Sequence, residues 1–224
     1  MIEVVNICKS IKGNQVLHDI SCCLDAGTVY GIYGRNGSGK TMLMRCILGL
    51  IYPDRGYVKI DGCVIGKEMD FPKSVGAIIE NPAFFPYATG YENLKMLADI
   101  KKRISGDKIR EMMRKVGLDD MDRRTVSKYS LGMRQRLAIA QAVMESPEIL
   151  VLDEPTNALD EQGVEMFRGL IQEEKGRGAL VIIASHNKED IDLLADVKIR
   201  MGDGRIEEMV GNQNGAGGKD DKKY

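Results

Sequence analysis

The chain has 224 residues, which is enough for one large domain with room for an embedded subdomain. Its 43% hydrophobic and 29% charged residues are typical of a soluble globular protein, and a formal net charge of -1 excludes a general attraction to nucleic acid or to an anionic membrane. No apolar run approaches the roughly 18 residues that are needed to cross a bilayer, and we expect no signal peptide at the amino terminus.

Short apolar segments bounded by glycine recur in the first third of the chain. Residues 2–7 and 16–24 alternate apolar and polar side chains, as strands of a partly exposed sheet do. The nearly all-apolar run 28–33 is followed by a glycine and predicts a buried parallel strand. Residues 41–50 predict a helix that is ended by a glycine and a proline. Two further strands are predicted, an edge strand at 57–62 and a buried strand at 74–79.

The second half of the chain alternates between helical and strand-like patterns. From residue 91 to about residue 126 the pattern is helical, and a further helix at 131–144 is ended by Pro147. Alternating strands and helices predict right-handed βαβ units and a mainly parallel sheet that is covered on both faces, which is an α/β fold. The later strands are predicted at 148–155, 178–186 and 196–201, with helices between them.

Two segments and the cysteines are interpreted from composition. Residues 107–124 are rich in charge, but acids are interleaved with the bases, so we expect a solvated face and no nucleic-acid patch. The Gly-rich, charged stretch 211–224 is expected to be disordered. Five cysteines with no C-x-x-C pair predict reduced, mostly buried thiols of a cytosolic protein, and no metal site; they are Cys8, Cys22, Cys23, Cys46 and Cys63.

The stretch "GRNGSGKT" matches the pattern G-x-x-x-x-G-K-[ST], follows a predicted strand and opens a predicted helix, so it is interpreted as a P-loop. Its glycines let successive backbone N–H groups face a phosphate cluster, and the following helix adds its positive end. Lys40 can reach the β- and γ-phosphates, and Thr41 can offer its hydroxyl to Mg²⁺. The predicted nucleotide-binding residues of this loop are Gly34, Arg35, Asn36, Gly37, Ser38, Gly39, Lys40 and Thr41.

The stretch "EILVLDEP" predicts the second half of a hydrolysis site. Four apolar residues, 149–152, place Asp153 at the carboxyl end of a buried strand, beside the crevice of the P-loop. An aspartate there can hold the coordination shell of Mg²⁺, while Glu154 can polarise an attacking water. Between the two halves, Ser130 is a good N-cap for the helix 131–144, and Gly132 allows a close backbone approach.

With these motifs in this order, the chain resembles the ATP-binding subunit of an ABC transporter from residue 2 to about residue 209. The signature would be 129–133, the D-loop 157–160, the Q-loop position Glu80 and the switch histidine His186. The resemblance implies an ABC-type ATPase domain at 1–210, with a mainly parallel sheet core, an antiparallel β subdomain and an inserted helical subdomain at about 83–142. In the family the switch histidine contacts the γ-phosphate, so catalytic roles are implied for Lys40, Glu154 and His186.

The resemblance also implies partners. ATPase subunits of this family form head-to-tail homo- or heterodimers, in which Ser130 and Gly132 would close on ATP held by the other subunit. The family places the groove for a membrane permease directly after the Q-loop, where this chain has Phe84, Phe85 and Tyr87. We therefore expect ATP and Mg²⁺ as cofactors, with Mg²⁺ held by Thr41, Glu80 and Asp153. The location implied is the cytoplasm, peripheral on the inner face of the cell membrane, with no nucleic-acid partner.

Three departures from the family pattern bear on the expected nucleotide preference and on the expected class of transporter. The signature reads "YSLGM" in place of L-S-G-G-Q, the Q-loop glutamine is Glu80, and the ring that stacks on adenine is replaced by Ile11, alongside Val16. Losing that ring predicts weak discrimination between ATP and GTP. The glutamate together with "YSLGM" looks like the ATPases of bacitracin and lantibiotic self-protection exporters, which implies export of a peptide antibiotic or a similar amphiphile.

Two alternatives belong to other functional classes. A soluble ABC-type ATPase that acts on nucleic acid or ribosomes would carry long coiled coils or two cassettes in one chain, and neither is present in the sequence. A catalytically inactive regulatory module would not be expected to keep Lys40, Asp153, Glu154 and His186 together.

Overall fold

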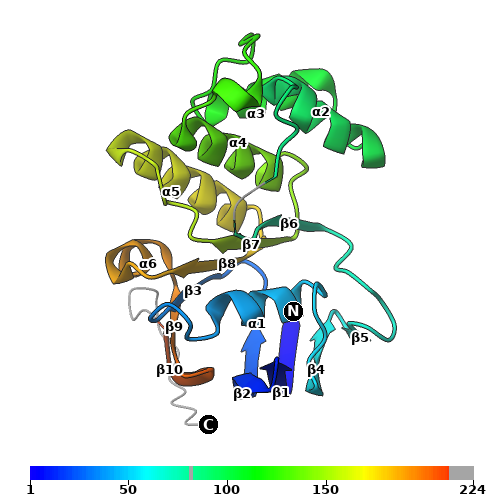
Figure 1. Cartoon of the computed structure of the whole chain (residues 1–224), viewed down its shortest axis with the longest axis vertical. Coiled ribbons are helices and arrows are strands. Elements are labelled where there is room, and N and C mark those ends of the chain that lie inside the picture. Colours follow the sequence, from blue (N-terminus) through cyan, green and yellow to red (C-terminus); the bar gives the residue numbers. More distant parts are fainter. Residues whose placement is uncertain (81–82, 212–224) are drawn as a thin grey trace.

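A computed structural model of the chain describes residues 1–80 and 83–211 (Figure 1). Residues 212–224, which make up all but the first residue of the tail expected to be disordered, lie outside the described residues. The described part contains two sheets, with helices stacked beyond one of them, and none of its helices is long and apolar enough to cross a membrane.

The first sheet is antiparallel and has the strand order β2-β1-β4-β5. The predicted strands at 2–7, 16–24 and 57–62 all belong to it, and the first of them is longer than predicted. The prediction that 57–62 is an edge strand is wrong, because β4 pairs with β1 on one side and with the short β5 on the other. Alternation along the start of β1 buries Ile2 and Val4, and an irregularity at Asn6, which has φ 46°, then brings Ile7 to the buried face. The bounds are Ile2–Ile11 for β1, Asn14–Leu24 for β2, Arg55–Ile60 for β4 and Cys63–Val64 for β5.

The second sheet has the order β10-β9-β3-β8-β7-β6, and only β10 runs antiparallel to its neighbour. Its central strands β7 and β8 are buried along their whole length, as parallel strands covered on both faces are. The α/β fold with a mainly parallel sheet is therefore confirmed. The bounds are Val29–Tyr33 for β3, Val75–Ile78 for β6, Ile149–Asp153 for β7, Leu180–Ser185 for β8, Val197–Gly202 for β9 and Arg205–Gly211 for β10.

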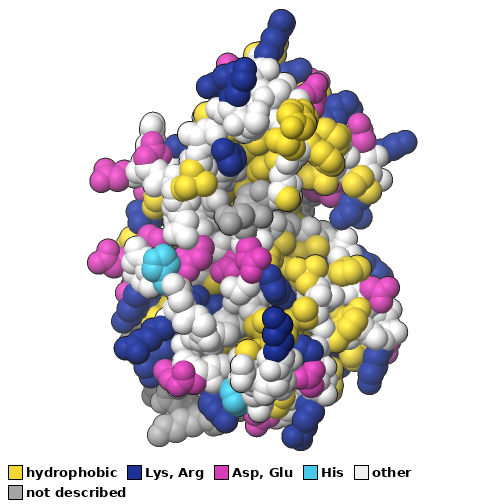
Figure 2. Space-filling view, viewed as in Figure 1, with side chains coloured by type: hydrophobic (Ala, Val, Ile, Leu, Met, Phe, Trp, Pro, Cys, Tyr) yellow, Lys and Arg dark blue, Asp and Glu magenta, His cyan; other side chains and the backbone are white. Residues whose placement is uncertain are grey.

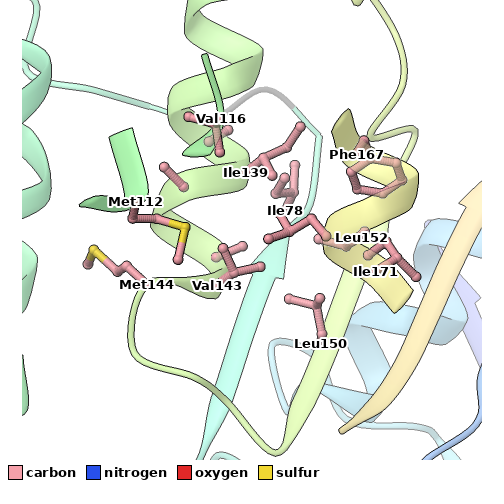
Figure 3. Close-up of a cluster of buried hydrophobic side chains, with 14 of the residues drawn as sticks. Ile78, Met112, Val116, Ile139, Val143, Met144, Leu150, Leu152, Phe167 and Ile171 are labelled. Carbon is pink, nitrogen blue, oxygen red and sulfur yellow. The ribbon is translucent and has the colours of Figure 1, made fainter. Parts of the chain in front are cut away.

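Helices cover both faces of the second sheet. On one face, α1 (Lys40–Ile47) shares a core with the antiparallel sheet, so it lies between the two sheets. The opposite face packs against α4 (Leu131–Val143) and α5 (Glu161–Gly176), and Figure 3 shows strand residues such as Ile78 and Leu152 meeting Phe167 of α5. The short helix α6 (Lys188–Leu194) packs against β3 and β8.

The region expected to be helical, at about 83–142, contains α2 (Gly90–Lys101), α3 (Gly106–Lys115), the 3-10 turn η1 (Val126–Lys128) and α4. The continuous helical pattern from residue 91 is divided in two, because Lys102 adopts φ 53° and ends α2 in the left-handed conformation. In Figure 1 these helices lie together beyond the edge of the sheet that carries β6.

The five cysteines are free, but fewer are buried than the sequence predicted. Alternation along β2 turns Cys22 inward and Cys23 outward, while Cys8 and Cys63 are half-buried. Burial raises the pKa of the Cys22 and Cys46 thiols to about 12, so both are inert at neutral pH.

Gly76 of β6 marks the closest approach between the sheet and α4. A Cβ atom at this position would lie 1.8 Å from the carbonyl oxygen of Ala142, so Gly76→Ala should lower the free energy of unfolding by about 1–3 kcal/mol. Gly169 of α5 is an exposed control with no atom within 4 Å of its added Cβ, and Gly169→Ala should stabilise by up to about 1 kcal/mol. Urea denaturation of the two variants measures both changes in the free energy of unfolding. An unchanged free energy of unfolding for Gly76→Ala would contradict the close packing of β6 against α4.

Candidate functional site

The loop 34–39 connects the buried strand β3 to α1, and its backbone requires glycine. Gly39 caps α1 at φ 101°, a conformation that side chains disfavour. Gly34 has φ 156°, and a Cβ atom there would lie 2.2 Å from the carbonyl oxygen of Met201. The glycines predicted from the P-loop pattern therefore let the chain turn tightly between β3 and α1.

Lys40 stands at the first position of α1 with its ammonium group inside the loop. Its Nζ donates to the carbonyl oxygens of Gly34, at 2.7 Å, and Arg35, at 3.2 Å, and the residue is only 6% exposed. Within the described part of the chain, the hydroxyl of Ser38 is buried without a hydrogen-bond partner. A buried cation that is satisfied by neutral carbonyls, beside an unpaired hydroxyl and a helix amino terminus, is suited to a polyanion.

A cavity of about 500 Å³ opens over this loop. Residues 36–42 and Val16 line it together with polar residues from other parts of the chain. In Figure 2 acidic side chains gather near the centre of the view, between the helical region and the two sheets. The polar lining residues outside the loop are Glu80, Gln135, Asp153, Glu154 and Asn157.

Asp153 is the last residue of β7, and it lies against the first turn of α1. Its carboxylate oxygen Oδ2 accepts a hydrogen bond of 2.6 Å from the hydroxyl of Thr41. Burial raises the pKa of the Asp153 carboxyl, and the negative charges of Glu154 and Glu80 raise it further, against the lowering effects of the Thr41 hydrogen bond and the charge of Lys40. The site therefore holds a carboxylate that a bound cation would stabilise.

Glu154 and His186 follow two neighbouring parallel strands, and the sheet brings them together. Glu154 turns out of the strand at φ 49°, and its carboxylate accepts a hydrogen bond of 2.9 Å from the backbone N–H of His186. The second carboxylate oxygen lies 2.8 Å from Nδ1 of the same histidine. The predicted base and the predicted switch histidine thus form one hydrogen-bonded pair at the edge of the cavity.

Glu80 reaches the cavity from the next strand, β6, which pairs in parallel with β7. Its Oε1 lies 2.7 Å from Nη2 of Arg45, in the last turn of α1. Sequence reasoning missed Arg45 because a basic residue near a helix end is usually a solvated charge. It also missed that Gln135, whose amide donates to the carbonyl oxygen of Pro155 at 2.8 Å, lines the cavity.

Of the remaining predicted site residues, some line the cavity and others do not. Val16 lines the cavity, whereas Ile11 is exposed at the end of β1 and is not among the described lining residues. The hydroxyl of Ser130 accepts from the backbone N–H of Met133 at 3.1 Å and caps α4 as predicted. Neither Ser130 nor Gly132 lines the cavity of its own chain.

Comparison with protein families identifies the chain. The model of the ABC transporter family matches residues 17–157, and the chain belongs to this family as an ATP-binding subunit and an ATPase. The ABC transporter ATP-binding protein YybJ of Bacillus subtilis is 51% identical over 92% of this chain and 95% of its own length. The bacitracin transport ATP-binding protein BcrA of Enterococcus faecalis is 38% identical over 94% and 69%, and the lantibiotic transport ATP-binding protein SrtF of Streptococcus pyogenes is 34% identical over 96% and 93%.

The solved structures show the same fold. The dimeric structure of MJ0796, a bacterial ABC transporter cassette, superposes with a TM-score of 0.85 over 94% of this chain and 98% of that chain, at 24% identity. The predicted P-loop NTPase fold of ABC type is therefore confirmed.

The raised pKa of Asp153 predicts a measurable stability cost. Because the folded state favours the protonated acid, stability falls as the pH rises from the usual carboxyl range through the raised pKa. Asp153→Asn should therefore raise the Tm of the nucleotide-free protein at about pH 7, by less at about pH 4, and should weaken MgATP binding. In a chain of this length each 1 kcal/mol corresponds to about 2–4 °C in Tm.

Asp160 is a control of opposite sign. A hydrogen bond from the backbone N–H of Gly163 holds the pKa of Asp160 below its usual value, with a further lowering by Arg136. Asp160→Asn should therefore lower the Tm at about pH 7 and lose its effect on acidification. Calorimetric scans of both variants across this range make the test, and a Tm of Asp153→Asn below the wild-type value at both pH values would contradict the assignment.

Proposed function

We propose that this ATPase powers a separate membrane permease that exports a peptide antibiotic of the bacitracin or lantibiotic type. The observation that carries the catalytic part is that Lys40, Thr41, Asp153 and Glu154 line one cavity at the carboxyl edge of the parallel sheet. His186 is not among the described lining residues, but it is hydrogen-bonded to Glu154 at the edge of that cavity. In open α/β sheets ligands bind outside the carboxyl ends of the strands, which is this edge. The names of the bacitracin and lantibiotic transport relatives support the class of substrate.

In the proposed site the loop 34–41 binds the triphosphate of ATP through its backbone N–H groups and the ammonium of Lys40. Within residues 1–80 and 83–211, no group of three or more His, Cys, Asp or Glu side chains forms a metal site by itself, so Mg²⁺ would take part of its ligands from the nucleotide. Thr41 and the buried Asp153 fit that arrangement, and Glu80 adds an oxygen across the cavity. The bound ion would supply charge neutralisation of the phosphates.

Glu154 is the proposed general base that takes a proton from the attacking water at its carboxylate. His186 holds that carboxylate through its backbone N–H and its ring, and it is the proposed contact to the γ-phosphate. Val16 is the proposed contact to the base of the nucleotide, and Ile11 remains a proposed second contact although it does not line the cavity.

The proposed active unit is a head-to-tail dimer, either of two copies or with a related ATPase. Ser130 is exposed at the amino terminus of α4, and the neighbouring Leu131 is 66% exposed although it is apolar. Gly132 lies close to the D-loop, since a Cβ atom there would be 2.9 Å from the carbonyl oxygen of Ala158. These residues are not among the described lining residues of the cavity over their own phosphate loop, and we propose that they cover the triphosphate bound by the other subunit.

Glu154→Gln tests the catalytic role and the dimer together. The amide keeps the shape of the carboxylate but cannot accept the proton, so we expect the hydrolysis rate to fall by about 10²–10⁴-fold, the usual worth of a general base. MgATP binding should survive, and the unhydrolysed nucleotide should accumulate a dimer that is visible in size-exclusion chromatography. A monomeric variant that hydrolyses ATP at the wild-type rate would refute both assignments.

The proposed permease-docking surface is the segment 84–89 that follows the Q-loop. Its aromatic side chains differ in burial: Phe84 packs against the core, whereas Phe85 is 65% exposed and Tyr87 is 89% exposed. The backbone beneath them is fixed, because Asn93, itself buried, accepts from the N–H of Phe85 at 2.8 Å and donates to the carbonyl oxygen of Phe85 at 3.1 Å. Exposed aromatic side chains on a rigid support are typical of protein interfaces.

The 3-10 turn η1 holds the same segment from the other side. The N–H groups of Val126 and Ser127 donate to the carbonyl oxygens of Ala88, at 2.9 Å, and Pro86, at 3.0 Å. Tyr91, a further aromatic residue just after this segment, is half-buried beneath Arg110, whose guanidinium lies 4.3 Å from the ring centroid. We propose that Phe85 and Tyr87 receive an amphipathic cytoplasmic helix of the permease, which would hold the chain on the inner face of the membrane.

Phe85→Ala and Tyr87→Ala should weaken copurification with the permease and abolish resistance to the exported antibiotic, while ATP binding is unchanged. Truncating an interface aromatic of this kind costs at least about 2 kcal/mol when it is a hot spot, or roughly 30-fold in affinity. Leu193→Ala on α6 is the matched control, because Leu193 is 62% exposed and lies in another part of the fold. Normal membrane association of both aromatic variants would place the docking surface elsewhere.

A further inference from the structure

Glu80 is held at the edge of the cavity by a side chain that does not line it. Arg45 Nη2 lies 2.7 Å from Glu80 Oε1, and the two side chains are 30% and 63% exposed, respectively. Arg45 belongs to α1, the same helix whose first residue is Lys40. The position of the carboxylate is thus tied to the helix that begins the phosphate loop.

The backbone at Glu80 adds a second observation. Its φ of 58° lies in the left-handed region, which a residue with a side chain occupies at a cost and keeps only when its surroundings enforce it. The strand β6 ends two residues earlier, at Ile78, so the chain leaves the sheet by this turn. The turn directs the carboxylate back toward α1, where Arg45 meets it.

The charges of the cavity explain why such a partner is needed. Glu80, Asp153 and Glu154 all line it, and Lys40 is the one cation among its described lining residues. A triphosphate brings further negative charge into the same space. An unpaired carboxylate at the Q-loop position would repel it, whereas the usual amide would not.

We propose that Arg45 is a positioning residue that serves as the counter-ion of Glu80, so that the site tolerates a carboxylate at the Q-loop position and still binds the triphosphate. The inference rests on the proposed ATP-binding function of this cavity and on the part that Glu80 takes in it. Arg45 lies outside the cavity lining and affects ATP binding only through Glu80.

A double-mutant cycle in the purified full-length chain isolates this role. Arg45→Met leaves Glu80 without its partner, and we expect it to weaken ATP binding about three- to tenfold, within the range of couplings between neighbouring charges. Glu80→Gln removes the charge that needs compensation. In that background Arg45→Met should therefore change ATP affinity by less than about twofold.

The measurement is calorimetric titration with ATP in EDTA, repeated with Mg²⁺, so the result does not depend on turnover. Arg168→Met is the matched control, since Arg168 of α5 is 32% exposed and pairs with the exposed Glu165 at 3.4 Å in an ion pair remote from the cavity lining. It should leave the affinity unchanged, and the Tm of each variant shows that it is folded. Arg45→Lys, which keeps the charge, should recover part of the loss.

The outcomes separate this inference from the proposed function. Equal losses from Arg45→Met in both backgrounds would overturn the inference alone, because Arg45 would then act independently of Glu80. No loss from Arg45→Met in the wild-type background would overturn it as well. A wild-type chain that does not bind ATP would contradict the proposed function and this inference together.

Discussion

The parallel pairing of β3, β8, β7 and β6 is the constraint on which the site depends. Parallel strands end on the same edge of a sheet, so whatever follows each of them is brought to one place. The loop after β3, the acids after β7, the histidine after β8 and Glu80 after β6 are far apart in the chain and share that edge. The hydrophobic strands therefore form a core and, because they run in the same direction, also bring the polar residues of the site together.

The shared edge also buries a carboxylate close to other acids, which is electrostatically unfavourable. Asp153 is buried next to two other acids. Its pKa is lowered by the hydrogen bond from the Thr41 hydroxyl and by the charge of Lys40, whose ammonium group already donates to the loop. Such an arrangement is unfavourable by itself, and the cation and phosphate chain proposed to bind here would offset it. The stability of the site is in this sense linked to its ligand.

The sequence allowed the strands, the phosphate loop and the pair Asp153 and Glu154 to be predicted, because each depends on a local pattern: an apolar run, glycines at fixed spacing, or acids directly after a strand. Arg45 and Gln135 could not be found in this way, since their relevance arises from which helices lie next to the cavity. Local patterns also could not predict which aromatic residues after the Q-loop are buried, because only the packed structure turns Phe84 inward and Tyr87 outward.

The buried amide of Asn93 has a consequence for how such a protein can diversify. It fixes the segment 85–89 through backbone atoms only, at the N–H and carbonyl groups of Phe85 and the carbonyl of Thr89. Side chains at positions 85 and 87 are therefore not needed to hold the segment in place. Under the proposed docking at Phe85 and Tyr87, these two side chains would be free to differ between transporters, so one ATPase scaffold would suit different membrane partners with no change at its catalytic edge.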